Sequence, residues 1–331
     1  MVNPMSIELI IVIGLAILFD FLNGIHDSSN IVATMISSRA FRPQVALTMT
    51  AVAEFSGPFL FGVAVAKTIG DEVALSGALT LHIITACLVA AILWNLLTWF
   101  LGMPSSSSHA LIGGLVGSVA MGAGFAAIKL SGLYKVLIAL FTSPLLGFGV
   151  GFLFLRLILF MAQNATPRIN TLFKRAQIIT ALGMAFSHGT NDAQKTMGII
   201  TLSLVIGGVL PSFQVPIWVV AISAGAISLG TSLGGWRLIR TLGSKFYKIR
   251  PVHSFTTQLT SGLVILVASL VGGPVSTTQV VSSAIIGVGS SERLGKVRWR
   301  VAEEIISAWL FTIPATGLLS AGIYLLLQRF F

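Results

Sequence analysis

The chain has 331 residues, of which 55% are hydrophobic and only 9% are charged, and its mean hydropathy is +0.95. An average soluble protein carries roughly 25% charged residues, so this composition excludes a soluble enzyme, a disordered protein and a disulfide-stapled secreted domain. It predicts an all-α membrane protein that crosses the lipid bilayer several times. The formal net charge of +10 is explained by loop cations that set membrane topology, and we expect no nucleic-acid partner.

Ten apolar segments follow one another along the chain, and a helical span requires about 20 apolar residues. No basic stretch precedes the first segment, which predicts a retained span rather than a cleaved signal peptide. Two segments, 105–128 and 274–290, begin with proline and hydroxyl residues and are rich in glycine, so that re-entrant helical hairpins and full spans both fit them. The ten segments are 6–35, 44–66, 74–101, 105–128, 134–162, 177–207, 213–235, 255–272, 274–290 and 302–327.

Lysine and arginine are distributed unevenly between the predicted loops. Fourteen of them fall in loops that ten spans would place on one side of the membrane, and only four fall in the loops opposite. The positive-inside rule makes the basic side cytoplasmic, which predicts a plasma-membrane protein with both termini outside. The basic loops are 36–43, 163–176, 236–254 and 291–301.

Two short motifs occur twice, in the same order. Residues 24–30 resemble 189–195 at an offset of 165, and residues 104–109 resemble 274–279 at an offset of 170. Matched pairs in one order indicate an internal duplication. Because each half holds five segments, an odd number, the second half enters the membrane inverted, which is the layout of secondary transporters with a midplane site. The predicted repeats are residues 1–165 and 166–331.

Asp27 and Asp192 occupy matched positions of the repeat, within apolar segments. A carboxylate at membrane depth is costly unless it faces a polar cavity or a partner. Gly24 and Gly189 precede them by three residues, which predicts a local break where unwound carbonyls and a carboxylate surround a cation. The alternative is that each aspartate caps a helix near the membrane interface.

Two runs of hydroxyl residues each follow a proline and precede a small-residue apolar helix. A helix N-terminus offers free N–H groups and a positive dipole end, and hydroxyls add donors without adding charge. Each run therefore predicts a cradle for a tetrahedral oxyanion; ordinary N-capping or helix packing is the alternative. The candidate substrate residues are Ser105, Ser106, Ser107, Ser108, Ser276, Thr277 and Thr278.

Glu54 and Lys195 also lie within apolar segments. Glu54 is a candidate for ion coupling or proton carriage, or else for a structural hydrogen bond to a neighbouring helix. Lys195 stands where the first repeat has Asn30 and follows Asp192 by three residues, which suits a helical ion pair. A tethered ammonium would then replace a mobile cation, or it would touch the anion directly. The histidines near the motifs are too dispersed to predict a metal cage: His26, His109 and His188.

These motifs resemble the duplicated signature of the inorganic phosphate transporter (PiT) family in its short prokaryotic form. The resemblance spans nearly the whole chain and rests on residues 23–30, 104–114, 188–195 and 273–278 together with Glu54. It implies symport of inorganic phosphate driven by protons or sodium, with inverted repeats, two re-entrant hairpins, commonly a homodimer, and no cofactor beyond the coupling ion.

The resemblance also implies roles for individual residues. The hydroxyl runs would contact phosphate, and the cation sites would lie at or beside Asp27, Asn30 and Asp192, supported by Asn23 and Asn191. If sodium is the coupling ion, Asp27 and Asp192 would be its ligands.

Two departures from the family pattern bear on coupling. Gln279 stands where family members often have histidine, matching His109 of the first repeat, which weakens a histidine-based proton relay. Asn30 against Lys195 breaks the asparagine symmetry of sodium-coupled relatives.

Other functions remain to be weighed against phosphate symport. A sulfate or related oxyanion permease would keep the same fold, and a metal–phosphate complex would satisfy the same charge balance. An enzyme is disfavoured because the chain has neither a Gly-x-Ser-x-Gly elbow nor the Walker A spacing. A channel is disfavoured because inverted repeats around a midplane site suit alternating access.

Overall fold

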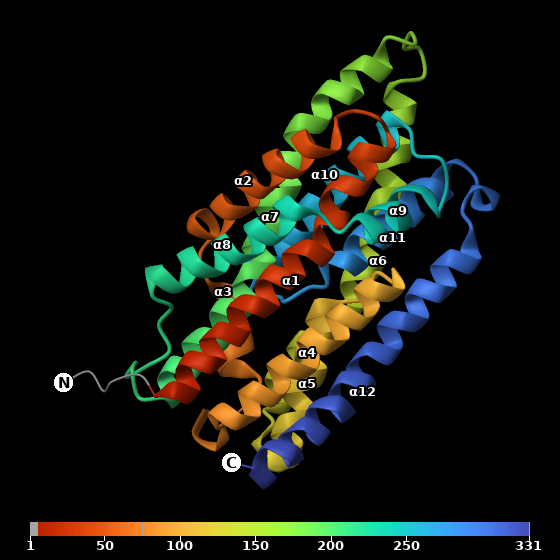
Figure 1. Cartoon of the computed structure of the whole chain (residues 1–331). Coiled ribbons are helices and arrows are strands. Elements are labelled where there is room, and N and C mark those ends of the chain that lie inside the picture. Colours follow the sequence, from red (N-terminus) through yellow and green to blue (C-terminus); the bar gives the residue numbers. More distant parts are fainter. Residues whose placement is uncertain (1–5, 75, 331) are drawn as a thin grey trace.

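The computed structural model of the chain describes residues 6–74 and 76–330. Within that part the chain forms twelve α-helices linked by turns and short 3-10 or π segments, and the predicted all-α class is confirmed (Figure 1). The terminal residues 1–5 and 331, on which the prediction for the chain ends falls, lie outside the described residues. The helices are α1 (Ile7–Ser37), α2 (Pro43–Phe61), α3 (Ala64–Lys67), α4 (Leu81–Leu101), α5 (Ser107–Gly122), α6 (Leu130–Met161), α7 (Ile169–Ile206), α8 (Ile217–Leu233), α9 (Trp236–Ser244), α10 (Pro251–Leu270), α11 (Thr277–Glu292) and α12 (Trp299–Phe330).

Each of the ten predicted segments contains one long helix, whereas the short helices α3 and α9 were not predicted separately. Four helices, α1, α4, α6 and α12, are long and apolar enough to cross a membrane. Two bent pairs, α2 with the segment from Ala64 to Glu72 and α8 with α9, bring the number to six. Helices α5 and α11 have 16 residues each, about 24 Å at 1.5 Å per residue, which is less than the roughly 30 Å of a hydrocarbon core.

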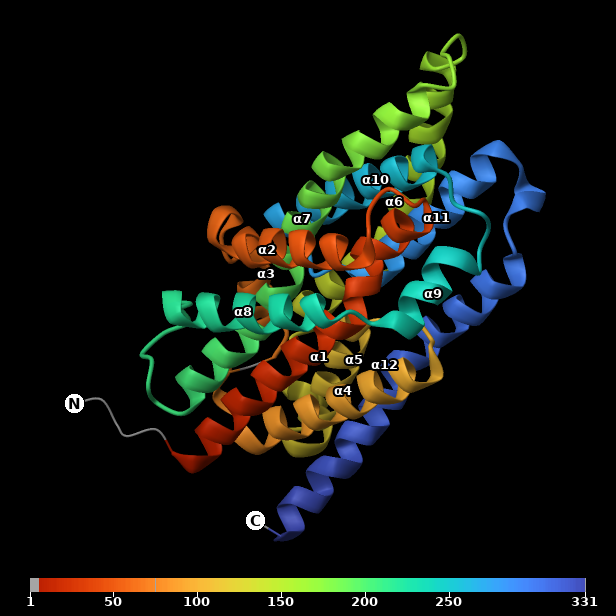
Figure 2. The same cartoon turned by 45° about the horizontal axis from the view of Figure 1, so that its top comes forward.

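The helices of the second half follow the same order as those of the first, and several matched helices agree in length. The bent pairs deviate by 74° and 71°, α5 and α11 match in length, and α6 and α12 have 32 residues each. Helices of each half pack on helices of the other half. Helix α1 packs on α8 and α7 packs on α2, and in the same way α12 packs on α5 and α6 packs on α11. Figures 1 and 2 show α4, α5 and α12 as one group of roughly parallel helices.

Matched glycines let the two halves approach each other closely. A Cβ atom on Gly24 would lie 2.1 Å from the carbonyl oxygen of Ile227, and one on Gly189 would lie 2.1 Å from that of Glu54. The prediction that these glycines break their helices was wrong, because α1 and α7 run through them without interruption. Their missing side chains instead allow two helix backbones to touch.

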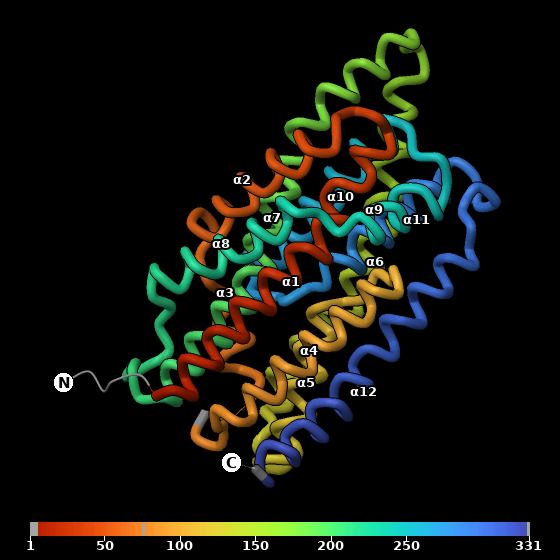
Figure 3. The backbone as a smooth tube through the Cα atoms, in the orientation of Figure 1, coloured from red at the N-terminus to blue at the C-terminus, as the bar shows by residue number. Residues whose placement is uncertain are grey.

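The α4–α5 and α10–α11 hairpins can be followed in the tube of Figure 3. Their tips meet, since Ser108 Oγ donates a hydrogen bond to the carbonyl oxygen of Val275 at 3.1 Å. The first tip contacts Lys195 of α7, and the second tip contacts Asp27 of α1 and Asp192 of α7. Four elements that are distant in sequence therefore converge on one buried region.

Candidate anion and cation site

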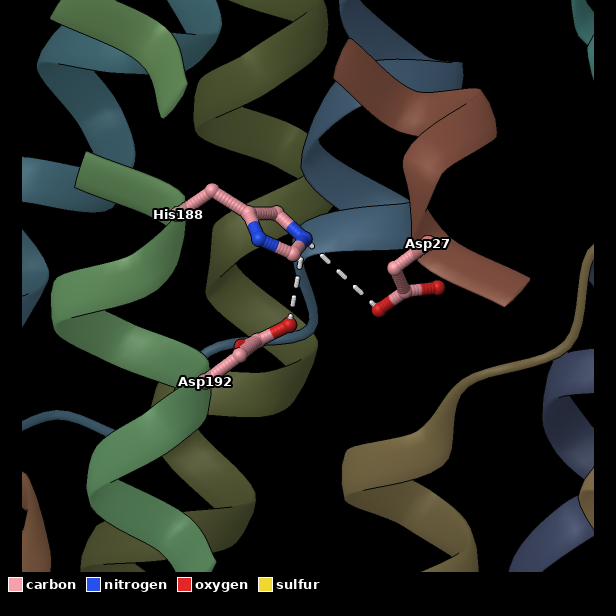
Figure 4. A group of neighbouring side chains, drawn as sticks. All are labelled: Asp27, His188 and Asp192. Atoms are coloured by element: carbon pink, nitrogen blue, oxygen red, sulfur yellow. Dashed lines mark ion pairs between the residues drawn. The ribbon is translucent and has the colours of Figure 1, made fainter. Parts of the chain in front are cut away.

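Asp27 of α1 and Asp192 of α7 face each other across His188 of α7, as Figure 4 shows. His188 Nε2 lies 3.2 Å from Asp192 Oδ2 and 3.8 Å from Asp27 Oδ2. The three side chains are buried, and one ligand atom from each lies within 4.8 Å of the others, close enough to hold a metal ion. Both aspartates lie in the middle of long helices, so the alternative that they cap helices is wrong.

His188 was not recognised as a member of this group from the sequence. The available signal was its spacing, because residues i and i+4 of a helix lie on one face and His188 precedes Asp192 by four residues. Its other ring nitrogen, Nδ1, lies 2.6 Å from Glu54 Oε1 on α2. Glu54 therefore fixes the imidazole so that Nε2 points at the two aspartates.

The tip of the second hairpin brings hydroxyl groups onto the same carboxylates. Thr277 Oγ1 lies 2.9 Å from Asp192 Oδ2 and 3.2 Å from Asp27 Oδ2. Thr278 Oγ1 donates to Asp27 Oδ1 at 3.1 Å and accepts a hydrogen bond from Asn30 Nδ2 at 3.1 Å. The first residue of this run, Ser276, caps α11 by accepting from a backbone N–H, so only one of its three hydroxyls is needed for capping.

In the tip of the first hairpin, too, one hydroxyl caps the following helix. Ser106 caps α5 by accepting from the backbone N–H of His109 at 3.1 Å. Ser105 Oγ donates to Thr98 Oγ1 at 2.8 Å, Ser107 is buried, and Ser108 reaches the opposite tip. The N-capping alternative thus holds for one serine in each run and leaves the other hydroxyls for another role.

Lys195 connects both tips to the carboxylates. Its ammonium forms the predicted ion pair with Asp192, and it also donates to Ser108 Oγ at 2.6 Å and to the Val275 carbonyl at 3.0 Å. The side chain is 2% exposed. A lysine has three donors, so all three N–H groups of this ammonium are hydrogen bonded in this structure.

The remaining predicted residues lie around this centre. Asn191 Nδ2 donates to Ser269 Oγ at 2.8 Å and to the Gly273 carbonyl at 3.2 Å, which ties α7 to the α10–α11 hairpin. Asn23 is buried. His109 and Gln279, which are matched in the repeat, both line a separate, largely apolar cavity of about 300 Å³ between α5, α6, α11 and α12.

Asp20 is a buried charged residue that the sequence analysis did not select. It lies on α1, two turns before Asp27, and is fully buried. The signal was present in the sequence as a third aspartate within an apolar segment, but Asp20 has no aspartate at the matching position of the second half.

Charge balance decides what this region can do chemically. Among residues 6–74 and 76–330, four buried carboxylates, those of Asp20, Asp27, Glu54 and Asp192, stand against one buried ammonium, that of Lys195. Unpaired charges of one sign strongly oppose each other in a low-dielectric interior. An incoming phosphate dianion would add to this excess, so protons or metal cations must neutralise the carboxylates before the anion can bind.

The long apolar helices define a multi-pass membrane protein, in which a buried group of carboxylates and an imidazole lies beside the tips of two helical hairpins. The chain belongs to the phosphate transporter family, whose sequence profile matches residues 23–167 and 159–320. This membership confirms the family predicted from the motifs and agrees with a transporter rather than an enzyme.

Similar proteins extend over almost the full chain. A protein of Bacillus subtilis named as a low-affinity inorganic phosphate transporter is 42% identical over 327 residues, covering 97% of this chain and 98% of that protein. One of Rhizobium meliloti with the same name is 43% identical over 314 residues, 94% of each. A solved structure titled "The sodium-dependent phosphate transporter" has the same fold, with a TM-score of 0.90 and 24% identity, covering 98% of this chain and 100% of that one.

Proposed function

We propose that the chain is a secondary active symporter that takes up inorganic phosphate across the plasma membrane by alternating access, coupled to protons or sodium. The observation that carries this proposal is the convergence of two hydroxyl-bearing hairpin tips on the buried group of Asp27, His188 and Asp192. The names of the bacterial relatives support phosphate as the substrate.

The proposed phosphate site lies between the two hairpin tips. Thr277 and Thr278 now donate to the aspartates, and Ser108 donates to a carbonyl on the other tip. A phosphate entering between the tips would receive these hydroxyl donors and the N-terminal N–H groups of α5 and α11. Lys195, already bonded to Ser108, would supply the nearest positive charge.

The proposed cation site is formed by Asp27, Asp192 and His188, with Asn30 bonded to the adjacent Thr278. Carboxylate and amide oxygens suit sodium or a divalent ion, and imidazole suits a transition metal. Because Lys195 neutralises Asp192, the second half has fewer free charges for a mobile cation than the first. The same group would accommodate a metal–phosphate complex, because carboxylate and imidazole ligands would hold the metal cation while the cation offsets the charge of the phosphate.

We further propose that residues 1–165 and 166–331 are inverted repeats. Support comes from the packing of each half's helices on the other half, the matched close approaches at Gly24 and Gly189, and the family match in two segments that meet near residue 165. Three basic turns, α1–α2, α9–α10 and α11–α12, meet at one cavity of about 560 Å³, and Figures 1 and 2 place the start of α1 and the end of α12 away from the α6–α7 turn. This supports a cytoplasmic basic side with both ends of the chain outside. A homodimer stays a prediction from the family resemblance.

The proposal is tested by uptake of radiolabelled phosphate into proteoliposomes under an imposed sodium or pH gradient, with excess sulfate as a competitor. Accumulation that sulfate leaves unchanged supports phosphate symport, and the gradient that drives it identifies the coupling ion. A parallel series with and without added divalent cations separates free phosphate from its metal complex. Accumulation of sulfate, or downhill flux alone, would replace the proposal with an oxyanion permease or a channel.

A further inference from the structure

Asp20 is a buried carboxylate whose charge nothing nearby balances. It lies on α1 and is 0% exposed, and neither of its oxygens has a hydrogen-bond partner within residues 6–74 and 76–330. Buried polar groups in native proteins are nearly always bonded, and buried charges are paired. Such an exception inside a transporter requires a bound species that completes it.

The surroundings of Asp20 supply neutral oxygens rather than a counter-charge. Thr196 of α7 lies beside it and can donate a hydrogen bond to it, and the Thr196 hydroxyl is buried with no other partner among the described residues. Asn23 lies one helical turn along α1, and its side-chain oxygen is likewise buried without a hydrogen-bond partner among the described residues. This group of three side chains, which we call the Asp20 cluster, thus holds several unused polar atoms.

The charged groups that act on Asp20 come from α7 and α2: they are Asp192, Lys195 and Glu54. Helix α8, which also packs on α1, has no titratable side chain, and α4 has only His82 and Cys87. The negative charges of the two carboxylates would repel a further negative charge on Asp20. Lys195 cannot serve it in this conformation, because its three donors are committed to Asp192, Ser108 and Val275.

These conditions select the protonated acid over a bound metal ion. Asp20, Thr196 and Asn23 together offer four side-chain oxygens, fewer than the roughly six to eight that a hard metal cation takes, whereas a proton needs only the carboxyl group itself. The neutral acid removes the cost of an unpaired charge.

We propose that Asp20 is a proton-carrying residue of the transport cycle. The inference rests on the proposed symport and deepens it by naming the proton as a coupling ion and Asp20 as its carrier. The Asp20 O–H bond forms with a proton from the side where phosphate is loaded. It breaks when the tips separate on the other side, where the proton passes to water. Separation also releases Lys195 from Ser108 and Val275, and either water or the freed ammonium would stabilise the carboxylate.

Asp20→Asn tests this role because asparagine resembles the protonated acid but cannot release a proton. In proteoliposomes we expect the variant to lose accumulation driven by a pH gradient by at least tenfold. It should retain exchange of external for internal phosphate, which needs no net proton movement, within about twofold. Asp71→Asn, a half-buried carboxylate outside the site, is the matched control and should retain both activities. Equal pH-driven accumulation by Asp20→Asn and wild type would overturn the proposal.

Infrared difference spectroscopy gives a readout that does not depend on transport. Wild-type protein in nanodiscs at neutral pH should show a protonated-carboxyl C=O band that Asp20→Asn lacks and that Thr196→Val shifts. If the band is unchanged in Asp20→Asn, Asp20 is ionised and the proposal fails. If wild type neither accumulates nor exchanges phosphate while the Asp20 band is present, symport itself fails and the protonated carboxyl stands.

Discussion

Lys195 Nζ lies 2.6 Å from Ser108 Oγ, so a cation on α7 of the second half is hydrogen bonded to the hairpin tip of the first half. The same ammonium pairs with Asp192 and bonds to Val275 at the other tip. One side chain thus joins the carboxylate group to both proposed anion cradles. Its matched residue in the first half, Asn30, reaches only the tip of the second hairpin.

Replacement of this ammonium should change the ion dependence of uptake. We expect Lys195→Asn, which restores asparagine at both matched positions, to raise the KM for phosphate at least tenfold in sodium-free medium. Added sodium should recover most of this loss, because the amide oxygen and the freed Asp192 carboxylate can bind a mobile cation. Uptake kinetics at several sodium concentrations provide the measurement.

Lys195→Met is the matched control for this experiment. Methionine fills a similar volume but offers neither a charge nor an oxygen ligand, so sodium should not restore its uptake. A Lys195→Asn protein with the KM and sodium dependence of wild type would show that the ammonium is neither a tethered cation nor a contact for the anion.

Glu54→Gln separates the two roles considered for Glu54. The amide oxygen of glutamine can still accept a hydrogen bond from His188 Nδ1, which Glu54 now contacts at 2.6 Å. A structural role would therefore survive the change. If the negative charge holds an imidazolium beside Asp192, uptake should fall about tenfold or more and its pH profile should change, because charge-assisted hydrogen bonds are the stronger ones.

Glu72→Gln is the matched control for Glu54→Gln. Glu72 pairs with Lys135 at 2.9 Å, but the pair is exposed, and surface ion pairs contribute little. Unchanged uptake is expected for this control. Unchanged uptake and pH profile in Glu54→Gln as well would reduce Glu54 to a structural hydrogen bond.

Much of this architecture could be predicted from the sequence because the membrane imposes a strong local rule. A span must be apolar, so Asp27, Asp192 and the hydroxyl runs stand out against their surroundings. The recurrence of both motifs then related the two halves without any knowledge of contacts. Each predicted segment contains one long helix for the same reason.

The errors concern contacts between helices that are distant in sequence. Gly24 and Gly189 are compatible with a broken helix and with close packing, and only the position of the opposing backbone decides between them. His188 could not be assigned to the carboxylates until α1 and α7 were seen to face each other. Asp20 has no matching aspartate in the second half. It stands out only in the structure, where its carboxylate oxygens have no hydrogen-bond partner among the described residues.

The glycine contacts predict a difference in stability between two positions on one helix. A Cβ atom on Gly189 would lie 2.1 Å from the Glu54 carbonyl oxygen, whereas one on Gly183, also on α7, meets nothing within 4 Å. We expect Gly189→Ala to be destabilised by about 3 kcal/mol or more, because overpacking forces the backbones apart. Gly183→Ala should be neutral or more stable by up to about 1 kcal/mol, since alanine favours a helix. Tryptophan fluorescence during thermal unfolding in detergent measures both, and equal melting temperatures would contradict the packing role of Gly189.

In the proposed phosphate site, the Thr277 hydroxyl turns from the two carboxylates to the substrate. Its Oγ1 lies within 3.2 Å of both Asp27 and Asp192, and its backbone begins α11, where the anion cradle is proposed. Thr277→Val keeps the shape but leaves buried acceptors without their donor, which costs about 1–3 kcal/mol. The KM for phosphate should therefore rise roughly 5- to 150-fold. Thr277→Ser keeps the hydroxyl and should stay within about threefold of wild type. Initial uptake rates over a range of phosphate concentrations test the pair, and a Thr277→Val protein with wild-type KM would remove this hydroxyl from the substrate site.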